Sequence, residues 1–161
     1  MPGDSWNLAP GLNNVGSYQV SGAPFASGSC LAPASGSTSL VVKFPAVTKW
    51  LQIEPVTGSG AVTPPSLRVA FSENGLHGKG GSGANGDGYN FRIHASSSFC
   101  RALDFKVSEL WFMSENSSTF TFDIIAGLTN VPFPRTTTNQ RDVNGTIEAG
   151  GPNWSGSIGV G

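Results

Sequence analysis

Residues Leu40–Glu54 read LVVKFPAVTKWLQIE and have the clearest strand pattern of the chain. Every second residue from Leu40 to Phe44 is apolar, and the same alternation returns from Thr48 to Glu54 after a proline at position 45. A period of two residues is typical of a β-strand with one buried face, because successive side chains of a strand point to opposite sides. The stretch therefore predicts two consecutive strands.

The same alternation recurs outside this stretch, and no segment has the period of a helix. The further strands that it predicts are Val15–Ser21, Leu67–Phe71, Tyr89–His94, Leu103–Val107 and Phe120–Ala126. The phase of the alternation slips near Ser108 and Glu109, where Leu110 and Phe112 occupy what was the polar face. Such a slip indicates either a β-bulge or a central strand that is buried on both faces.

Glycine, proline and small polar residues separate these segments. They predict a break at Gly22–Pro24, a loop at Ser27–Ser39, a turn at Ala46–Val47 and an irregular segment with no packed element at Glu73–Gly88. Connections of this length favour a Greek-key or jelly-roll arrangement over a meander of tight hairpins. We therefore expect an all-β protein, an antiparallel jelly-roll-type β-sandwich with essentially no α-helix.

The two ends of the chain lack periodicity, which predicts extended arms at residues 1–14 and 132–161 around a sandwich domain at 15–131. The arms contain the large apolar residues that we expect at an interface, namely Trp6, Leu8, Phe133 and Trp154. An aromatic side chain left in water forfeits about 1.5–3 kcal/mol, which docking on a neighbour would recover. The alternatives are that the arms are disordered tails or that they fold back on their own sandwich.

The charge composition points away from several classes of function. Only 12% of the residues are charged, and 9 Lys and Arg nearly balance 10 Asp and Glu. We therefore expect no nucleic-acid partner, because a phosphate backbone calls for a basic surface. We also expect no membrane span and no signal peptide, since no long apolar stretch is present and the residues from Met1 to Asn7 have no basic or apolar region. A nearly neutral polar surface suits a protein that packs against copies of itself or a scaffold, with a secreted binding module as the next choice.

The residues that could carry chemistry are sparse. His77 lies in the glycine-rich segment and His94 at a strand end, without the third ligand that a metal site needs nearby. Cys30 and Cys100 are read as free thiols, with a sheet-bridging disulfide as the alternative. Asn85–Gly88 is read as a turn, because the acidic ligands of a calcium loop are missing around it. We therefore expect no catalytic residue, no metal and no cofactor, and a protein that is not an enzyme.

The four tryptophans leave two interpretations open. Trp50 and Trp111 alternate with polar residues, so one of them could face outward as part of a carbohydrate-binding surface. Ordinary packing in the core or at an interface is the other interpretation. For Trp6 and Trp154, which lie in the arms, we favour anchoring in a neighbour's pocket over sugar binding.

Three segments resemble small virion structural proteins of tailed phages and other aquatic viruses. They are KFPAVTKWLQI at Lys43–Ile53, RVAFSENG at Arg68–Gly75 and FDIIAGLT at Phe122–Thr129, and the resemblance spans about Leu40 to Pro132. These motifs are strand patterns and not catalytic signatures. The resemblance implies a jelly-roll protein with a capsid, decoration or cement-type role.

From the composition and the resemblance together we expect a non-enzymatic virion structural protein. It would serve in capsid decoration, as cement or as a minor capsid protein, and attach through its sandwich and terminal arms. Its expected partners are the major capsid protein or other virion proteins and copies of itself, with a trimer as the natural state, and its expected location is the virion assembled in the host cytoplasm. The alternative is a carbohydrate-binding module or the receptor-binding head of a fibre.

Overall fold

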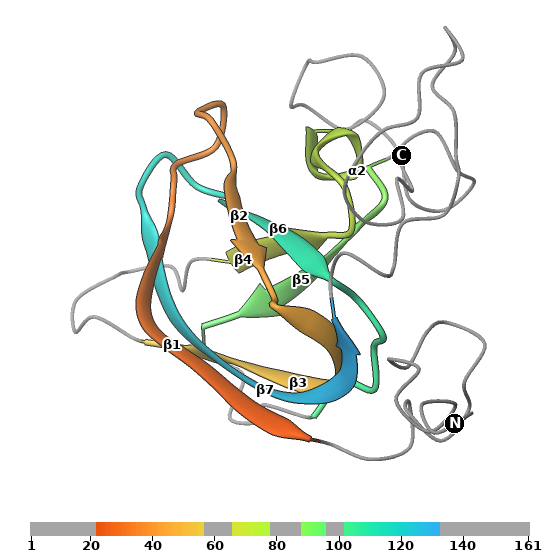
Figure 1. Ribbon diagram of the computed structural model, residues 1–161. Coiled ribbons are helices and arrows are strands. Elements are labelled where there is room, and N and C mark those ends of the chain that lie inside the picture. Colours follow the sequence, from red (N-terminus) through yellow and green to blue (C-terminus); the bar gives the residue numbers. More distant parts are fainter. Residues whose placement is uncertain (1–21, 57–65, 78–87, 96–101, 133–161) are drawn as a thin grey trace, which may run out of the picture.

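The computed structural model describes residues 22–56, 66–77, 88–95 and 102–132 (Figure 1). Within these residues the chain forms seven strands and one short helix: β1 (Ala23–Ala32), β2 (Leu40–Lys43), β3 (Ala46–Pro55), β4 (Ser66–Ala70), α2 (Glu73–His77), β5 (Asn90–His94), β6 (Glu109–Ser114) and β7 (Phe120–Pro132). Every pair of neighbouring strands is antiparallel.

The strands form two sheets that pack face to face. One sheet has the order β1-β7-β3 and the other the order β2-β6-β4-β5; Figure 1 shows them as separate layers. The extended segment 103–107 lies along the free side of β3, where Leu51 and Leu103 exchange backbone hydrogen bonds of 2.9 and 2.7 Å. When this segment is counted with the sheet of β3, the chain changes sheet at every connection except the one between β4 and β5, which is the connectivity of a jelly roll. The predicted antiparallel jelly-roll sandwich is confirmed.

The core lies between the two sheets and is almost entirely aliphatic and aromatic. Phe112 of β6 and Phe122 of β7 meet across the layers with ring centroids 4.6 Å apart. The rings of Phe71, Phe91 and Phe105 form a second group with centroids 5.3 to 6.3 Å apart. Aromatic pairs at these separations add to the free energy of burying their area.

The strands predicted from alternation are mostly present. The predicted segments Leu40–Phe44, Thr48–Glu54, Leu67–Phe71, Tyr89–His94 and Phe120–Ala126 correspond to β2, β3, β4, β5 and β7. The phase slip at Ser108–Glu109 marks the point where the chain leaves the side of β3 and enters β6 in the other sheet. Strand β6 buries Leu110 and Phe112 on one face and Met113 on the other, so the prediction of a central strand buried on both faces is confirmed.

The N-terminal part of the sandwich corrects two predictions. Strand β1 runs through the predicted break at Gly22–Pro24 and through the first part of the predicted loop at Ser27–Ser39. Proline is tolerated there because β1 is the edge strand of its sheet, with β7 as its partner on one side. The alternation is hidden because a register shift between Ser27 and Cys30 inserts a bulge, and because the strand consists mainly of small residues.

The predicted turn at Ala46–Val47 is also wrong, since both residues belong to β3. The pairing of β3 with β7 shifts between Ala46 and Thr48 and again between Thr48 and Trp50. These irregularities interrupt the alternation at the start of β3, which is why the sequence indicates a strand only from Thr48 onward.

Helix α2 overturns the prediction that Glu73–Gly88 contains no packed element. The helix begins after Ser72, whose Oγ accepts a 2.9 Å hydrogen bond from the backbone N–H of Gly75. This side chain occupies the position of an N-cap, which satisfies one of the free N–H groups of the first turn. The carbonyl of Ser72 accepts a hydrogen bond from the N–H of Leu76 at 3.2 Å. Both groups of Ser72 therefore stabilise the N-terminus of this single helical turn.

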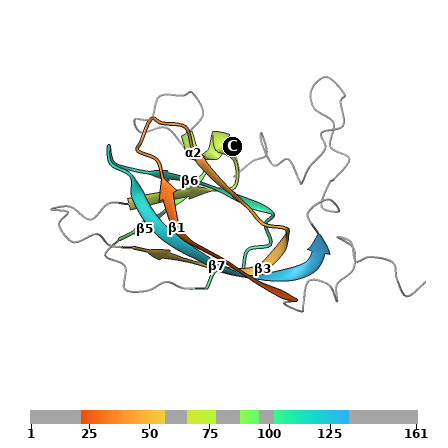
Figure 2. The same ribbon diagram turned by 60° about the vertical axis from the view of Figure 1, so that its left-hand side comes forward.

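Leu76 explains why this short helix is packed at all. Its side chain is fully buried and joins Ala70 and Met113 in a small second core, with Trp111 against it. In both views the helix lies on the side of the four-stranded sheet that faces away from the three-stranded sheet (Figures 1 and 2). Ala70, which the alternation places on a polar outer face beside Arg68, is therefore buried beneath the helix.

The predictions for the chain ends fall outside the described residues. These are the arms at 1–14 and 132–161, apart from position 132 at the end of β7, and the strand Val15–Ser21.

Candidate interaction surfaces

The four residues predicted to lie at an interface, Trp6, Leu8, Phe133 and Trp154, are outside the described residues. The described part of the sandwich offers two other surfaces, one on the outside of each sheet. Neither surface depends on residues that the sequence singled out as interface residues.

The outer face of the three-stranded sheet carries exposed apolar side chains. Ile125 of β7 is 41% exposed, and Leu31 and Val56 lie on either side of Thr121 with exposures of 55% and 45%. Among the described residues the one other large hydrophobic side chain with comparable exposure is Tyr89. Three exposed apolar side chains on the outside of one sheet make this face a candidate contact surface.

Two carboxylates lie among these apolar side chains. Glu54 of β3 and Asp123 of β7 are direct cross-strand partners, and both project from the outer face. Oε1 of Glu54 accepts a 2.6 Å hydrogen bond from Nε2 of Gln52. We call the surface formed by Leu31, Glu54, Val56, Asp123 and Ile125 the β7 face.

A β-bulge in β1 shapes one side of the β7 face. Gly28 and Ser29 together oppose Asp123, because the register shifts between Ser27 and Cys30. Ser29 has a φ of 57°, in the left-handed region that non-glycine residues rarely adopt. Its backbone N–H donates a 2.7 Å hydrogen bond to Oδ1 of Asp123.

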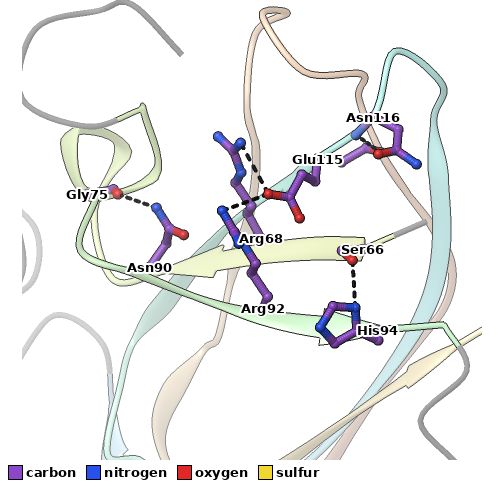
Figure 3. Close-up of polar contacts among 9 residues, drawn as sticks. Ser66, Arg68, Gly75, Asn90, Arg92, His94, Glu115 and Asn116 are labelled. Atoms are coloured by element: carbon purple, nitrogen blue, oxygen red, sulfur yellow. Dashed lines mark hydrogen bonds and ion pairs between the residues drawn. The ribbon is translucent and has the colours of Figure 1, made fainter. Parts of the chain in front are cut away.

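The outer face of the four-stranded sheet carries a pair of arginines. Arg68 of β4 and Arg92 of β5 are direct cross-strand partners. Figure 3 shows both side chains converging on Glu115, which follows β6: Nη2 of Arg92 lies 2.7 Å and Nη2 of Arg68 lies 3.5 Å from the same Oε1. We call the surface formed by Arg68, Arg92, His94 and Glu115 the arginine face.

The two guanidinium groups differ in exposure. The side chain of Arg68 is only 14% exposed, and its Nε is buried without a hydrogen-bond partner. The side chain of Arg92 is 55% exposed, so most of its N–H groups remain accessible. Next to this pair, Nδ1 of His94 lies 2.8 Å from Oγ of Ser66 (Figure 3). Two guanidinium groups against one carboxylate leave this end of the sheet with an excess of positive charge.

Helix α2 covers the neighbouring part of the same sheet. Leu76 packs over Ala70 and Met113, and Nδ2 of Asn90 donates a 3.1 Å hydrogen bond to the carbonyl of Gly75 (Figure 3). Trp111 is half-buried in this region, and its Nε1 lies 3.4 Å from a carboxylate oxygen of Glu109. The arginine face is therefore the part of this outer surface beside the helix.

The described part of the structure does not bring together the residues that were considered for catalysis or metal binding. Within the described residues, no three His, Cys, Asp or Glu side chains lie close enough to hold a metal ion. His94 is on β5, whereas His77 ends α2. Cys30 is a half-buried free thiol whose Sγ lies 3.3 Å from Oγ of Ser27, and Cys100 is outside the described residues. In the described part of the chain, the only helix has five residues, too few to cross a bilayer.

Sequence reasoning missed most of the residues of these two surfaces. Ile125 has the same parity in β7 as Thr121 and Asp123, so the alternation does place an apolar residue on the polar face. Leu31 was hidden in a segment expected to be a loop. The pairing of Glu54 with Asp123 has no local signal, because the two residues belong to strands that are far apart in the chain.

Neither a protein-family model nor a curated protein matches this chain.

Proposed function

We propose that this chain is a non-enzymatic structural protein of a virus particle, in a decoration, cement or minor capsid role. The observation that carries the proposal is the β7 face, on which Leu31, Val56 and Ile125 are exposed around two carboxylates. Covering such side chains is favourable because it removes apolar area from water. A protein that spends its working life against a particle surface or against copies of itself covers them.

Two further features support this role. The jelly roll is one of the architectures that recur in viral capsid proteins, although it also occurs in lectins and other proteins. The charged fraction of 12% is about half of what is usual for a soluble domain, which fits a protein whose surface is largely in contact with other subunits. The proposed partners are the major capsid protein or other virion proteins, and copies of this chain.

A second candidate function rests on Trp50. This half-buried side chain lies on the same side of β3 as Gln52 and Glu54, an arrangement in which an aromatic ring and polar groups could hold a sugar. This arrangement favours a carbohydrate-binding module or the receptor-binding head of a fibre. It is the weaker candidate because it depends on one half-buried tryptophan, whereas the β7 face has three exposed apolar side chains.

Fractionation of particles separates the two candidates. A culture that expresses the gene is lysed, and the lysate is resolved on a density gradient. Quantitative mass spectrometry then measures this chain in each fraction, while packaged genome copies locate the particles. The proposal expects the chain to peak with the particles in a fixed ratio to the major capsid protein. Recovery of the chain only in the soluble fractions contradicts the proposal.

A glycan array probed with the purified chain tests the second candidate. Tight binding to a defined glycan, lost in Trp50→Ala, would establish sugar recognition. If that result came together with recovery in particle fractions, the chain would be a receptor-binding component of the particle. If it came without such recovery, the structural role would be replaced by the carbohydrate-binding one.

A further inference from the structure

Each sheet of the sandwich carries a pair of like charges in direct cross-strand register. Glu54 faces Asp123 on the β7 face, and Arg68 faces Arg92 on the arginine face. Like charges placed directly opposite each other across two antiparallel strands destabilise a sheet. The isolated chain thus carries an acidic pair and a basic pair, one on the outside of each layer.

The two pairs have opposite charges, and the residues of each pair are similarly spaced. Directly opposed residues of antiparallel strands have Cβ atoms about 4.5–5.5 Å apart, whichever sheet they belong to. The Cβ atoms of the two acidic residues are therefore about as far apart as the Cβ atoms of the two arginines. Guanidinium and carboxylate groups also form the strongest of the common charge-assisted hydrogen bonds, in fork-like pairs.

The surroundings of the two pairs are complementary too. On the β7 face, the carboxylates lie between Ile125 on one side and Leu31 and Val56 on the other. On the arginine face, the aliphatic stems of Arg68 and Arg92 can cover apolar side chains while their charged ends pair with carboxylates. Glu115 contacts Nη2 of each guanidinium through one of its oxygens, and the 55% exposure of the Arg92 side chain leaves N–H groups for a partner.

From these observations we infer that the chain associates with itself head to tail, with the β7 face of one copy against the arginine face of the next. The exposed guanidinium group of Arg92 then pairs with the carboxylates of Glu54 and Asp123 of the neighbouring copy, while the largely buried Arg68 stays against Glu115. This inference deepens the proposed function and rests on it in one respect: a protein that coats a particle is held at high density beside its own copies. The partner of both faces is a second copy of this chain.

Head-to-tail contact has a consequence for the symmetry of the assembly. Because two different surfaces of the chain meet, the contact is heterologous, and such contacts form a closed ring when the rotation between copies closes and a filament when it does not. A two-fold dimer whose axis passes through the acidic pair of the β7 face would instead bring Glu54 and Asp123 against the same carboxylates of the partner, which electrostatic repulsion opposes.

Charge reversal on the full-length purified chain tests the inference. Sedimentation velocity measures self-association of the wild type, Glu54→Arg, Arg92→Glu and the double variant carrying both changes, at low and moderate salt. Each single reversal is expected to weaken association at least about tenfold, which is about 1.4 kcal/mol of binding free energy. The double variant is expected to regain association, because the charges are exchanged between the two faces. An equimolar mixture of the two single variants should also associate, since one pairing between them is native and the other is exchanged.

The design also separates loss of contact from loss of folding. Glu54→Arg turns a like-charge cross-strand pair into a pair of opposite charges, so the melting temperature of the monomer should not fall. Arg92→Glu does the same opposite Arg68 but gives up the 2.7 Å ion pair with Glu115, so its association is measured well below its own melting temperature. Lys43→Glu is the matched control: it makes the same change of charge on β2, at the other edge of the sheet that carries Arg92, and should leave association unchanged. Unchanged association of both single variants, or failure of the double variant to recover, overturns the inference.

A monomeric wild type at every concentration also overturns it. The proposed function would still stand in that case if the chain were recovered with purified particles, because recovery does not depend on self-association in solution. Conversely, head-to-tail association of a chain that is absent from particles would uphold this contact and contradict the proposed function.

Discussion

The backbone N–H of Ser29 donates a 2.7 Å hydrogen bond to Oδ1 of Asp123, across the bulge in the edge strand β1. Asp123 thus has two roles on the β7 face: it holds the bulge of β1 and it faces Glu54 of β3. The bulge interrupts the regular hydrogen-bonding edge of β1, which is one of the ways in which natural sheets avoid uncontrolled edge-to-edge pairing.

Two substitutions of Asp123 separate these roles. Asp123→Ala removes the acceptor for Ser29 and is expected to lower the free energy of unfolding by about 0.5–1.5 kcal/mol, the usual net value of one hydrogen bond. Asp123→Asn keeps an oxygen in the same place and removes the repulsion from Glu54, so its stability at low salt should at least equal that of the wild type. Urea unfolding measures both. An Asn variant as unstable as the Ala variant would show that the charge, and not the acceptor, holds the bulge.

Thr48 is expected to be the most sensitive polar residue of the core. Its fully buried Oγ1 donates to the carbonyl of Phe105 at 2.5 Å and accepts from the N–H of Val107 at 3.0 Å, which ties the segment 103–107 to β3. Thr48→Val keeps the shape but leaves these buried groups unpaired, which costs about 1–3 kcal/mol. The control is Thr121→Val, which makes the same change on the outer face of β7. Equal urea midpoints for the two variants would contradict this assignment.

Helix α2 should depend on its cap and on a single side chain. Ser72→Ala is expected to cost about 1 kcal/mol, because it removes the acceptor for the N–H of Gly75. Leu76→Ala is expected to cost about 2–5 kcal/mol, as for other fully buried leucines. Thermal melts compare both variants with Ser117→Ala, an exposed serine in a turn. A loss from Leu76→Ala no larger than that from Ser117→Ala would show that the helix does not pack as described.

Glu115 is expected to contribute to folding stability through its ion pairs with Arg68 and Arg92. Glu115→Gln leaves Arg68 and Arg92 facing each other without a carboxylate, and we expect a loss of about 1 kcal/mol that shrinks as salt is added. Adding Arg92→Gln removes the repulsion, so the double variant should regain part of the stability. A double-mutant cycle in urea gives the coupling between the two sites. Strictly additive losses would mean that Glu115 does not couple to Arg92.

The alternation of apolar residues was enough to predict most of the sandwich. In β3 and β7 the core-facing rows are long and regular, so Leu51, Ile53, Phe122 and Ile124 are buried as the sequence indicates. Strand β1 escaped detection because its alternation is interrupted by the bulge and because few of its side chains are large. Helix α2 escaped it because one buried leucine is too little to produce a helical period.

The two surfaces were harder to predict for a different reason. Arg68 and Arg92 belong to strands separated by a long connection, and Glu54 and Asp123 lie at still greater separation in the chain. Alternation tells which side chains share a face of one strand, but it does not give the register between strands that are distant in sequence. The like-charge pairs therefore emerge only when the pairing of the sheets is known.

The role of the β7 face in the particle can be measured by the occupancy of purified particles by variants of this face. Particles are prepared with the wild-type chain, with Ile125→Lys or with Ser118→Lys, which places the same charge in an exposed turn. Mass spectrometry gives the number of copies of this chain per major capsid protein. We expect Ile125→Lys to lose most of its occupancy, because a lysine ammonium group is costly to bury in an apolar contact, while Ser118→Lys stays near the wild-type value. Equal occupancy of the two variants would contradict the claim that the β7 face is a contact surface of this protein in the particle.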